Sequence, residues 1–224
     1  MGLNKEKCDA SLGAKIKNHL VELGVETPML FGQRQDDTQQ VIDIQHHFES
    51  IMKTLGMNLE DDSLRDSPRR VAKMFVNELF WGLSSDHFPK CTVIENKMGY
   101  DEMVLERDIN VMSTCEHHFV TISCVAHVAY IPNQWVLGLS KMNRIVEFFS
   151  RRPQVQERLT EQIYHALSYI LKTEDVAVVV DAEHFCVKSR GVEDSHSSTL
   201  TSKLGGVFKT EPELRAEFMH LLRK

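Results

Sequence analysis

A short segment of the chain carries the residue types of a metal site. It covers residues 113–118, STCEHH, in which Cys115 and His118 have the Cys-x-x-His spacing that allows both to bind one ion. A third soft ligand, Cys186, lies far downstream. Two thiolates and one imidazole suit Zn²⁺ and leave its fourth tetrahedral position open for a water, whose pKa falls to about 7. The pattern is compatible with a catalytic zinc site.

The same spacing fits two structural interpretations. In the first, the cysteine is a buried free thiol and the histidine is a core residue, which is the commoner origin of an isolated Cys-x-x-His pair. In the second, a fourth protein ligand closes a purely structural zinc site. Cys91 and Cys124 are candidates for that ligand, so spacing and cysteine count leave both interpretations open.

Two further histidines flank the possible ligands. His117 directly precedes His118, and His184 lies two residues before Cys186. Histidine titrates near neutral pH and can act as a general acid or base. Taken singly, each is more often an ordinary surface or core residue. Beside metal ligands, both are candidates for proton transfer.

Basic residues provide candidate positions for an anionic substrate. The formal net charge is −6, which argues against a general nucleic-acid-binding protein. Lys141 and Arg144 lie at the expected start of a helix, where the dipole disfavours a cation unless an anion binds nearby. The sequence has no Walker-type loop, so side chains and helix ends would hold a triphosphate. The basic candidates are Arg70, Lys73, Lys141, Arg144, Arg151, Arg152, Lys188 and Arg190.

Some charged positions have a structural interpretation that is preferred on position alone. Lys73, Arg151 and Arg152 are expected to be solvated charges on helix faces. Gln156 and Glu157 lie at the expected start of another helix. A carboxylate there interacts favourably with the helix dipole and needs no ligand.

Length and composition indicate one globular domain with a sizeable core and an added helical arm. The longest apolar runs are too short to span a membrane, and the N-terminus has no apolar signal core. The five cysteines are odd in number and widely spread. This arrangement is not a secreted disulfide framework, so a cytoplasmic location with free thiols is expected.

The helices that must position these residues are predicted from hydrophobic periodicity. A linker is expected over residues 26–37, and residues 210–213, TEPE, form a possible capping box. Helices are expected over residues 11–23 with Ser11 as N-cap, over 38–55, from Ser67 to Gly82, from Ser140, from Pro153 and after the capping box.

Strands are expected where Val, Ile, Thr and Tyr recur, over residues 91–98, 102–113, 118–131 and 175–188. Alternation places His118 on the packed face of the third strand, while His184 and Cys186 share a face of the fourth. Residues 189–206 are rich in Ser, Thr and Gly and are expected to form a substrate-side loop. The order of elements predicts an α+β domain with an antiparallel sheet.

Four segments together resemble the GTP cyclohydrolase I family of bacterial type. They are residues 115–118 (CEHH), 138–144 (GLSKMNR), 152–159 (RPQVQERL) and 184–191 (HFCVKSRG). The likeness runs from about residue 40 to the C-terminus. One departure is Ser67, which stands where the family has threonine.

The resemblance implies the tunnelling fold, an α+β fold with an antiparallel sheet and helices packed on one face. It also implies an N-terminal helical extension and sheets joined into a barrel across subunits. The expected assembly is a toroidal homodecamer of two pentamers. Residues 1–37 would form the N-terminal helix and linker, and residues 38–224 the catalytic domain.

The resemblance also implies zinc-dependent hydrolysis of GTP at guanine C8. The products would be formate and 7,8-dihydroneopterin triphosphate, in the first step of folate or tetrahydropterin biosynthesis. The implied zinc ligands are Cys115, His118 and Cys186, and the implied catalytic histidines are His117 and His184. The implied substrate-binding residues are Arg70, Ser140, Lys141, Arg144, Gln156, Glu157 and Arg190, with the Gln-Glu pair on guanine.

Two other classes of function are alternatives. Another tunnelling-fold enzyme, a pterin synthase or a nitrile-reducing deazaguanine enzyme, would need three zinc-binding histidines or a nucleophilic cysteine without zinc. The Cys, His, Cys set argues against both. A non-catalytic, zinc-stabilised oligomeric binding protein would bind zinc but leave GTP unchanged.

Overall fold

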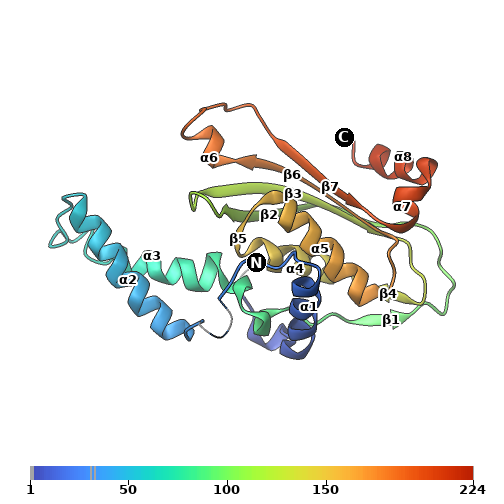
Figure 1. Ribbon diagram of the computed structural model, residues 1–224, viewed down its shortest axis with the longest axis horizontal. Helices are drawn as coiled ribbons and strands as arrows, with labels where there is room; N and C mark the ends of the chain where they lie inside the picture. Colours follow the sequence, from blue (N-terminus) through green and yellow to red (C-terminus); the bar gives the residue numbers. More distant parts are fainter. Residues whose placement is uncertain (1–2, 31, 33, 224) are drawn as a thin grey trace.

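The computed structural model describes residues 3–30, 32 and 34–223. Its centre is a curled five-stranded sheet in the order β5-β2-β3-β6-β7 (Figure 1). The strands from β2 to β7 pair antiparallel, as predicted, and only the short β5 runs parallel to β2. The strands are β2 (Val104–Cys115), β3 (Thr121–Tyr130), β5 (Pro153–Gln154), β6 (Val176–His184) and β7 (Thr199–Leu204). A separate ribbon pairs β1 (Val93–Glu95) with β4 (Trp135–Leu137).

Two long helices cover one face of the sheet. They are α4 (Leu139–Ser150) and α5 (Gln156–Leu171). Val178 and Val180 of β6 belong to the same buried cluster as Phe149 and Ile163 of these helices. The burial follows from sequence, because the apolar residues of each helix recur on one side and those of the strand alternate.

The opposite face is also partly covered, which corrects the expectation of helices on one face only. The C-terminal helices α7 (Gly206–Thr210) and α8 (Pro212–Leu221) lie there, beside β6 and β7 in Figure 1. Phe208 and Phe218 pack against Ala129, Ala177 and Val179 in a second cluster. Small residues on this face of the strands leave room for the two aromatic rings.

The N-terminal helix α1 (Ala10–Glu22) shares the main core. Ile16 and Leu20 are buried with the residues of α4 and α5. Gly13 allows the close approach, because a Cβ there would lie 2.0 Å from the carbonyl oxygen of Ser85. The Asp9 carboxylate accepts from the Leu12 N–H and caps the helix, whereas Ser11, the expected cap, lies inside it.

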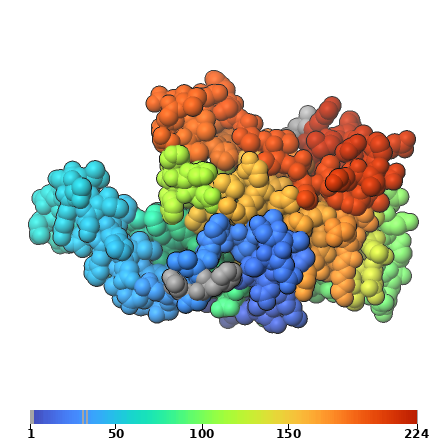
Figure 2. Space-filling model, viewed as in Figure 1, coloured from blue at the N-terminus to red at the C-terminus, as the bar shows by residue number. Residues whose placement is uncertain are grey.

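Helices α2 (Asp37–Thr54) and α3 (Ser67–Met74) form an arm that projects from the body (Figures 1 and 2). Met52 is the one buried residue of α2. The helical path continues from α3 through a π-turn at Phe75–Leu79. The remaining short turns are Lys5–Lys7, Trp81–Leu83 and Ser85–His87.

Several predicted boundaries are wrong near the candidate site. Strand β6 ends at His184, and Cys186 lies on the short helix α6 (Phe185–Lys188). His118 lies in the exposed turn before β3 rather than on a packed strand face. The predicted loop 189–206 contains β7, whose backbone groups pair with β6. Helix α5 begins only at Gln156, because the preceding residues pair with β2.

The predicted capping box before the last helix does not form. Thr210 ends α7, and its hydroxyl donates to the carbonyl oxygen of Gly206. The N-cap of α8 is Glu211, whose side chain makes no capping bond. Among the described residues, no helix is both long and apolar enough to cross a bilayer.

Candidate metal and substrate site

Strand register brings three soft ligands together. The ligand atoms of Cys115, His118 and Cys186 all lie within 4.8 Å of one another. The first ends β2, the second lies in the β2–β3 turn, and the third follows β6. Antiparallel pairing of β3 with β6 places Ile122 opposite His184, so the turn and the end of β6 meet.

The chemistry of Cys115, His118 and Cys186, together called the metal group below, fits a zinc ion. Burial, and then the neighbouring Cys115 thiol, raise the pKa of the Cys186 thiol. A cation between the two sulfurs would favour their thiolate forms instead. Two cysteines and one histidine are a donor set that zinc accepts with one position left open.

A fourth protein ligand from another cysteine is not part of the group in the described chain. The Cys91 thiol donates to the carbonyl oxygen of Pro89 at 3.4 Å. The Cys124 thiol donates to the carbonyl oxygen of Ile122 at 3.8 Å in the core. The closed structural site considered from the sequence is therefore not formed by either residue.

Backbone hydrogen bonds fix the turn between β2 and β3. We call it the metal-binding turn because it carries Cys115 and His118, two of the three candidate ligands. The Cys115 N–H donates to the carbonyl of Val120 at 2.8 Å, and the Phe119 N–H donates back to the carbonyl of Cys115 at 2.9 Å. Phe119 has φ of 54°, the left-handed conformation that closes the turn. The Glu116 N–H donates to the carbonyl of Gln154 at 3.1 Å, which attaches the turn to β5.

The two candidate catalytic histidines have different environments. His117 is exposed, with Nδ1 3.8 Å from the Cys115 sulfur. His184 Nε2 donates to the Gln156 side-chain oxygen at 2.8 Å, because an amide oxygen can only accept. Burial lowers the pKa of His184, and the negative charge of Glu157 opposes that change. The hydrogen bond fixes the proton on Nε2 and leaves Nδ1 as an acceptor.

Gln156 and Glu157, at the start of α5, have different surroundings. Gln156 is only 3% exposed, and its amide nitrogen donates to the carbonyls of Val180 and Thr199 at 2.9 and 2.8 Å. With His184 on its oxygen, both the nitrogen and the oxygen of this amide have partners inside the chain. Glu157 is exposed beside it, so it is the member of the predicted guanine-binding pair that a ligand can reach.

Of the predicted cations, Arg190 lies at the metal group. Its Nη1 donates to His118 Nε2 at 2.9 Å. A guanidinium cannot accept, so this imidazole nitrogen carries a lone pair of the kind that binds a metal. Arg70 is instead exposed on α3, 3.9 Å from Asp66.

The predicted substrate residues of α4 belong to a different part of the chain. Arg144 lines a cavity of about 270 Å³ together with Lys7, Cys8 and Trp81, and no member of the metal group lines it. The charges of Lys141 and Arg144 oppose the rise in the pKa of Cys91. Ser140 lies exposed at the start of the same helix. Within one chain, the cavity beside Arg144 and the metal group therefore share no lining residue.

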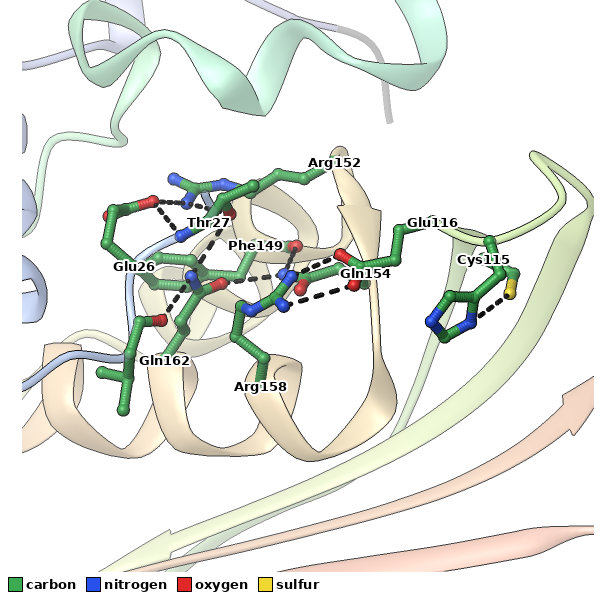
Figure 3. A network of polar contacts seen from close by, with 11 residues as sticks. Glu26, Thr27, Cys115, Glu116, Phe149, Arg152, Gln154, Arg158 and Gln162 are labelled. Atoms are coloured by element: carbon green, nitrogen blue, oxygen red, sulfur yellow. Dashed lines mark hydrogen bonds and ion pairs between the residues drawn. The ribbon is translucent and has the colours of Figure 1, made fainter. Parts of the chain in front are cut away.

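Figure 3 shows a buried polar network that local sequence patterns do not predict. Arg158 contacts both carboxylate oxygens of Glu116, at 2.5 and 3.3 Å. Arg152, expected to be solvated, is 4% exposed and donates to Glu26 at 2.6 Å. Its partner lies in the N-terminal segment, far away in sequence, so no spacing rule could reveal the pair. Arg151 is likewise mostly buried, beside Glu147.

Comparison with known proteins identifies the family. The model of the family described as GTP cyclohydrolase I matches residues 44–223. The chain belongs to the GTP cyclohydrolase I family. It is 58% identical over 205 residues to GTP cyclohydrolase 1 of Shewanella denitrificans, covering 92% of this chain and 94% of that protein. It is 59% identical over 201 residues to GTP cyclohydrolase 1 of Aeromonas hydrophila, covering 90% and 92%.

We predict that two buried thiols of this GTP cyclohydrolase I family member react slowly. Burial raises the pKa of both Cys91 and Cys124 to about 12. At pH 8 their thiolate fraction should be about a thousandfold below that of a free cysteine. Alkylation followed by mass spectrometry should therefore modify Cys8 well before either, because Cys8 is less buried and Lys5 and Lys90 oppose the rise in its pKa.

The rates at Cys91 and Cys124 should rise about tenfold per pH unit toward pH 11, since thiolate is the reacting species. Unfolding in urea should make all five cysteines equally reactive. Modification of Cys124 in the folded protein at pH 8 as fast as that of Cys8 would contradict this prediction.

Proposed function

We propose that this protein hydrolyses GTP to formate and 7,8-dihydroneopterin triphosphate, the first step of folate or tetrahydropterin biosynthesis. The observation that carries the proposal is the convergence of Cys115, His118 and Cys186 in a member of the GTP cyclohydrolase I family.

Cys115, His118 and Cys186 would hold one zinc ion. Bound there, zinc would supply Lewis-acid activation of the water that adds to guanine C8. His184 is held by Gln156 through Nε2–H, so its Nδ1 can accept a proton and return it to guanine N7 as the ring opens. His117, on the exposed side of the turn, would serve the opening of the ribose.

Guanine recognition is assigned to Glu157. Guanine presents N1–H and the exocyclic N2 amine side by side, and one carboxylate can accept from both. Adenine offers a lone pair at N1 and no amine at C2. Gln156 contributes by anchoring the start of α5 to β6 and β7, since its own amide is occupied.

The direct test is turnover by the zinc-loaded protein. We expect formate release and pterin fluorescence from GTP, with one zinc per chain by metal analysis. Cys186→Ser should lose most of the zinc and all ring opening, because removing a ligand weakens the site at least as much as removing its supporting residues. Zinc binding without any change to GTP would instead indicate the non-catalytic binding protein.

Glu157→Ala tests the guanine assignment. We expect GTP turnover to fall at least a thousandfold and the binding preference for GTP over ATP to disappear, because the carboxylate, once the bound base covers it, is left unpaired when that base is the wrong one. Zinc content and thermal stability should match the unmodified protein. A variant that still selects GTP would show that Glu157 is only a helix-end carboxylate.

We further propose that several copies complete each site in a toroidal decamer of two pentamers. The support is that Arg144 lines a cavity that no member of the metal group lines within one chain. The sheet ends at β7 on one side and, on the other, at the outer side of β2, where only Thr114 and Cys115 pair with the short β5. These edge strands run in opposite directions, so β7 of one copy can pair antiparallel with β2 of the next and close a barrel.

In such a ring, Arg70, Lys141 and Arg144 of neighbouring copies would join Arg190 around the triphosphate. Charge-assisted contacts of this kind each contribute about 1.5–3 kcal/mol when shielded from water. Residues 1–37 would remain an N-terminal extension, with α1 packed on the catalytic domain of residues 38–224.

Mixing two inactive variants tests the shared site. Arg144→Ala and Cys186→Ser should each be inactive alone. Co-assembled at random in equal amounts, they should regain about a quarter of the unmodified activity, because that fraction of shared sites has both intact halves. Light scattering should give a mass many times 25.7 kDa for every sample. An active monomer, or no regain in properly assembled mixtures, would contradict the proposal.

A further inference from the structure

Glu116 lies inside the metal-binding turn, yet its side chain is directed away from the metal group. In Figure 3 the carboxylate extends toward α5, while the Cys115 sulfur lies on the other side of the turn. Arg158 holds both of its oxygens, at 2.5 and 3.3 Å. Two parallel contacts from a planar guanidinium restrict orientation as well as distance.

Arg158 belongs to the part of α5 that is assigned to guanine. It directly follows Glu157, and the start of the helix is anchored by the Gln156 bonds to Val180 and Thr199. The ion pair therefore joins the turn that carries two metal ligands to the helix end that carries the base-reading carboxylate. It is a direct side-chain connection between the two halves of the reaction centre within one chain.

A buried platform supports this connection. The Gln154 carbonyl accepts from the Glu116 N–H. The side chain of Gln154 is fully buried, and its amide nitrogen donates to the Phe149 carbonyl at 2.9 Å and to the Gln162 side-chain oxygen at 2.8 Å. Gln162 in turn donates to the carbonyl of Val25 at 2.9 Å. The turn is thus fixed by its backbone on one side and by its carboxylate on the other.

We propose that Glu116 and Arg158 are positioning residues that hold the metal ligands at a fixed place relative to the guanine-binding end of α5. This inference rests on the proposed function. Neither member of the pair is one of the proposed metal ligands or guanine contacts, and the pair would act through Cys115, His118 and Glu157. Its predicted role is to fix the distance from the metal group to guanine C8, on which the rate of ring opening depends.

A matched control lies on the same helix. Glu161 of α5 pairs with Lys203 of β7 at 3.0 Å, and their side chains are 32% and 34% exposed. The side chains of Glu116 and Arg158 are 26% and 17% exposed, so both ion pairs are partly buried. Lys203 lies opposite Val178, well before the His184 end of β6. Loss of this pair removes an ion pair of similar kind from α5 without touching the metal-binding turn.

The experiment compares Arg158→Met and Glu116→Gln with Lys203→Met in the full-length protein. Zinc affinity is measured by chelator competition, which needs no turnover. We expect Arg158→Met to weaken zinc about tenfold and to lower kcat at least tenfold, the effect typical of residues that orient metal ligands. KM for GTP should change less than about threefold, because Glu157 and the phosphate-binding cations remain. Lys203→Met should leave zinc affinity and kcat within about twofold.

The double variant Arg158→Met with Glu116→Gln should be no worse than the worse single variant, since both remove the same contact. Arg158→Lys, which keeps the charge but not the paired contact, should recover part of the loss and remains usable if Arg158→Met fails to fold. Zinc affinity and kcat within twofold of the unmodified protein in Arg158→Met, or in Arg158→Lys where Arg158→Met fails to fold, would overturn the proposal. So would losses equal to those of Lys203→Met.

The two proposals fail separately. If the unmodified, zinc-loaded protein leaves GTP unchanged, the proposed function is wrong. The chelator measurement then still decides whether Glu116 and Arg158 position the metal ligands. If turnover is normal but both variants bind zinc and turn over GTP like the unmodified protein, only the positioning role is wrong.

Discussion

The register between β3 and β6 is the constraint on which the site depends. It places Ile122 opposite His184 and so brings the β2–β3 turn to the segment that carries Cys186. A shift of one residue would move every side chain of the strand to the opposite face. The valines of β6 prevent that shift, because Val178 and Val180 are buried against α4 and α5 while Val179 packs beneath α7 and α8.

A second constraint is the pairing of the buried Arg152 with polar groups of the N-terminal segment. Burial lowers the pKa of Arg152, and the Glu26 carboxylate opposes that change. A buried charge without its partner is strongly destabilising, so the pair fixes where the chain passes after α1. Thr27 and Gln162 extend the same network, and Gln154 connects it to the metal-binding turn. Residues outside the family match thereby support the site.

The sequence alone determined the metal group and the main elements. Cys115, His118 and Cys186 were recognisable from ligand type and motif, and the structure brings them within 4.8 Å. The two long helices and the central strands followed from periodicity, which depends only on residues a few positions apart along the chain. Family membership also needed only sequence, because several motifs in order are far more specific than one spacing. Boundaries were less certain: Cys186 lies on α6, and the predicted loop 189–206 contains β7.

Tertiary structure alone decided which polar residues have partners. Arg152 was expected to be a solvated charge on a helix, but it is buried and pairs with Glu26. Gln156 was expected to contact a ligand, but its side chain is hydrogen-bonded to His184, Val180 and Thr199. The tertiary structure also places Arg144 in a cavity that no member of the metal group lines, and it pairs Glu116 with Arg158. The physical reason is that these contacts join residues distant in sequence. Local propensity has no information about them until the sheet register and the packing of the helices are fixed.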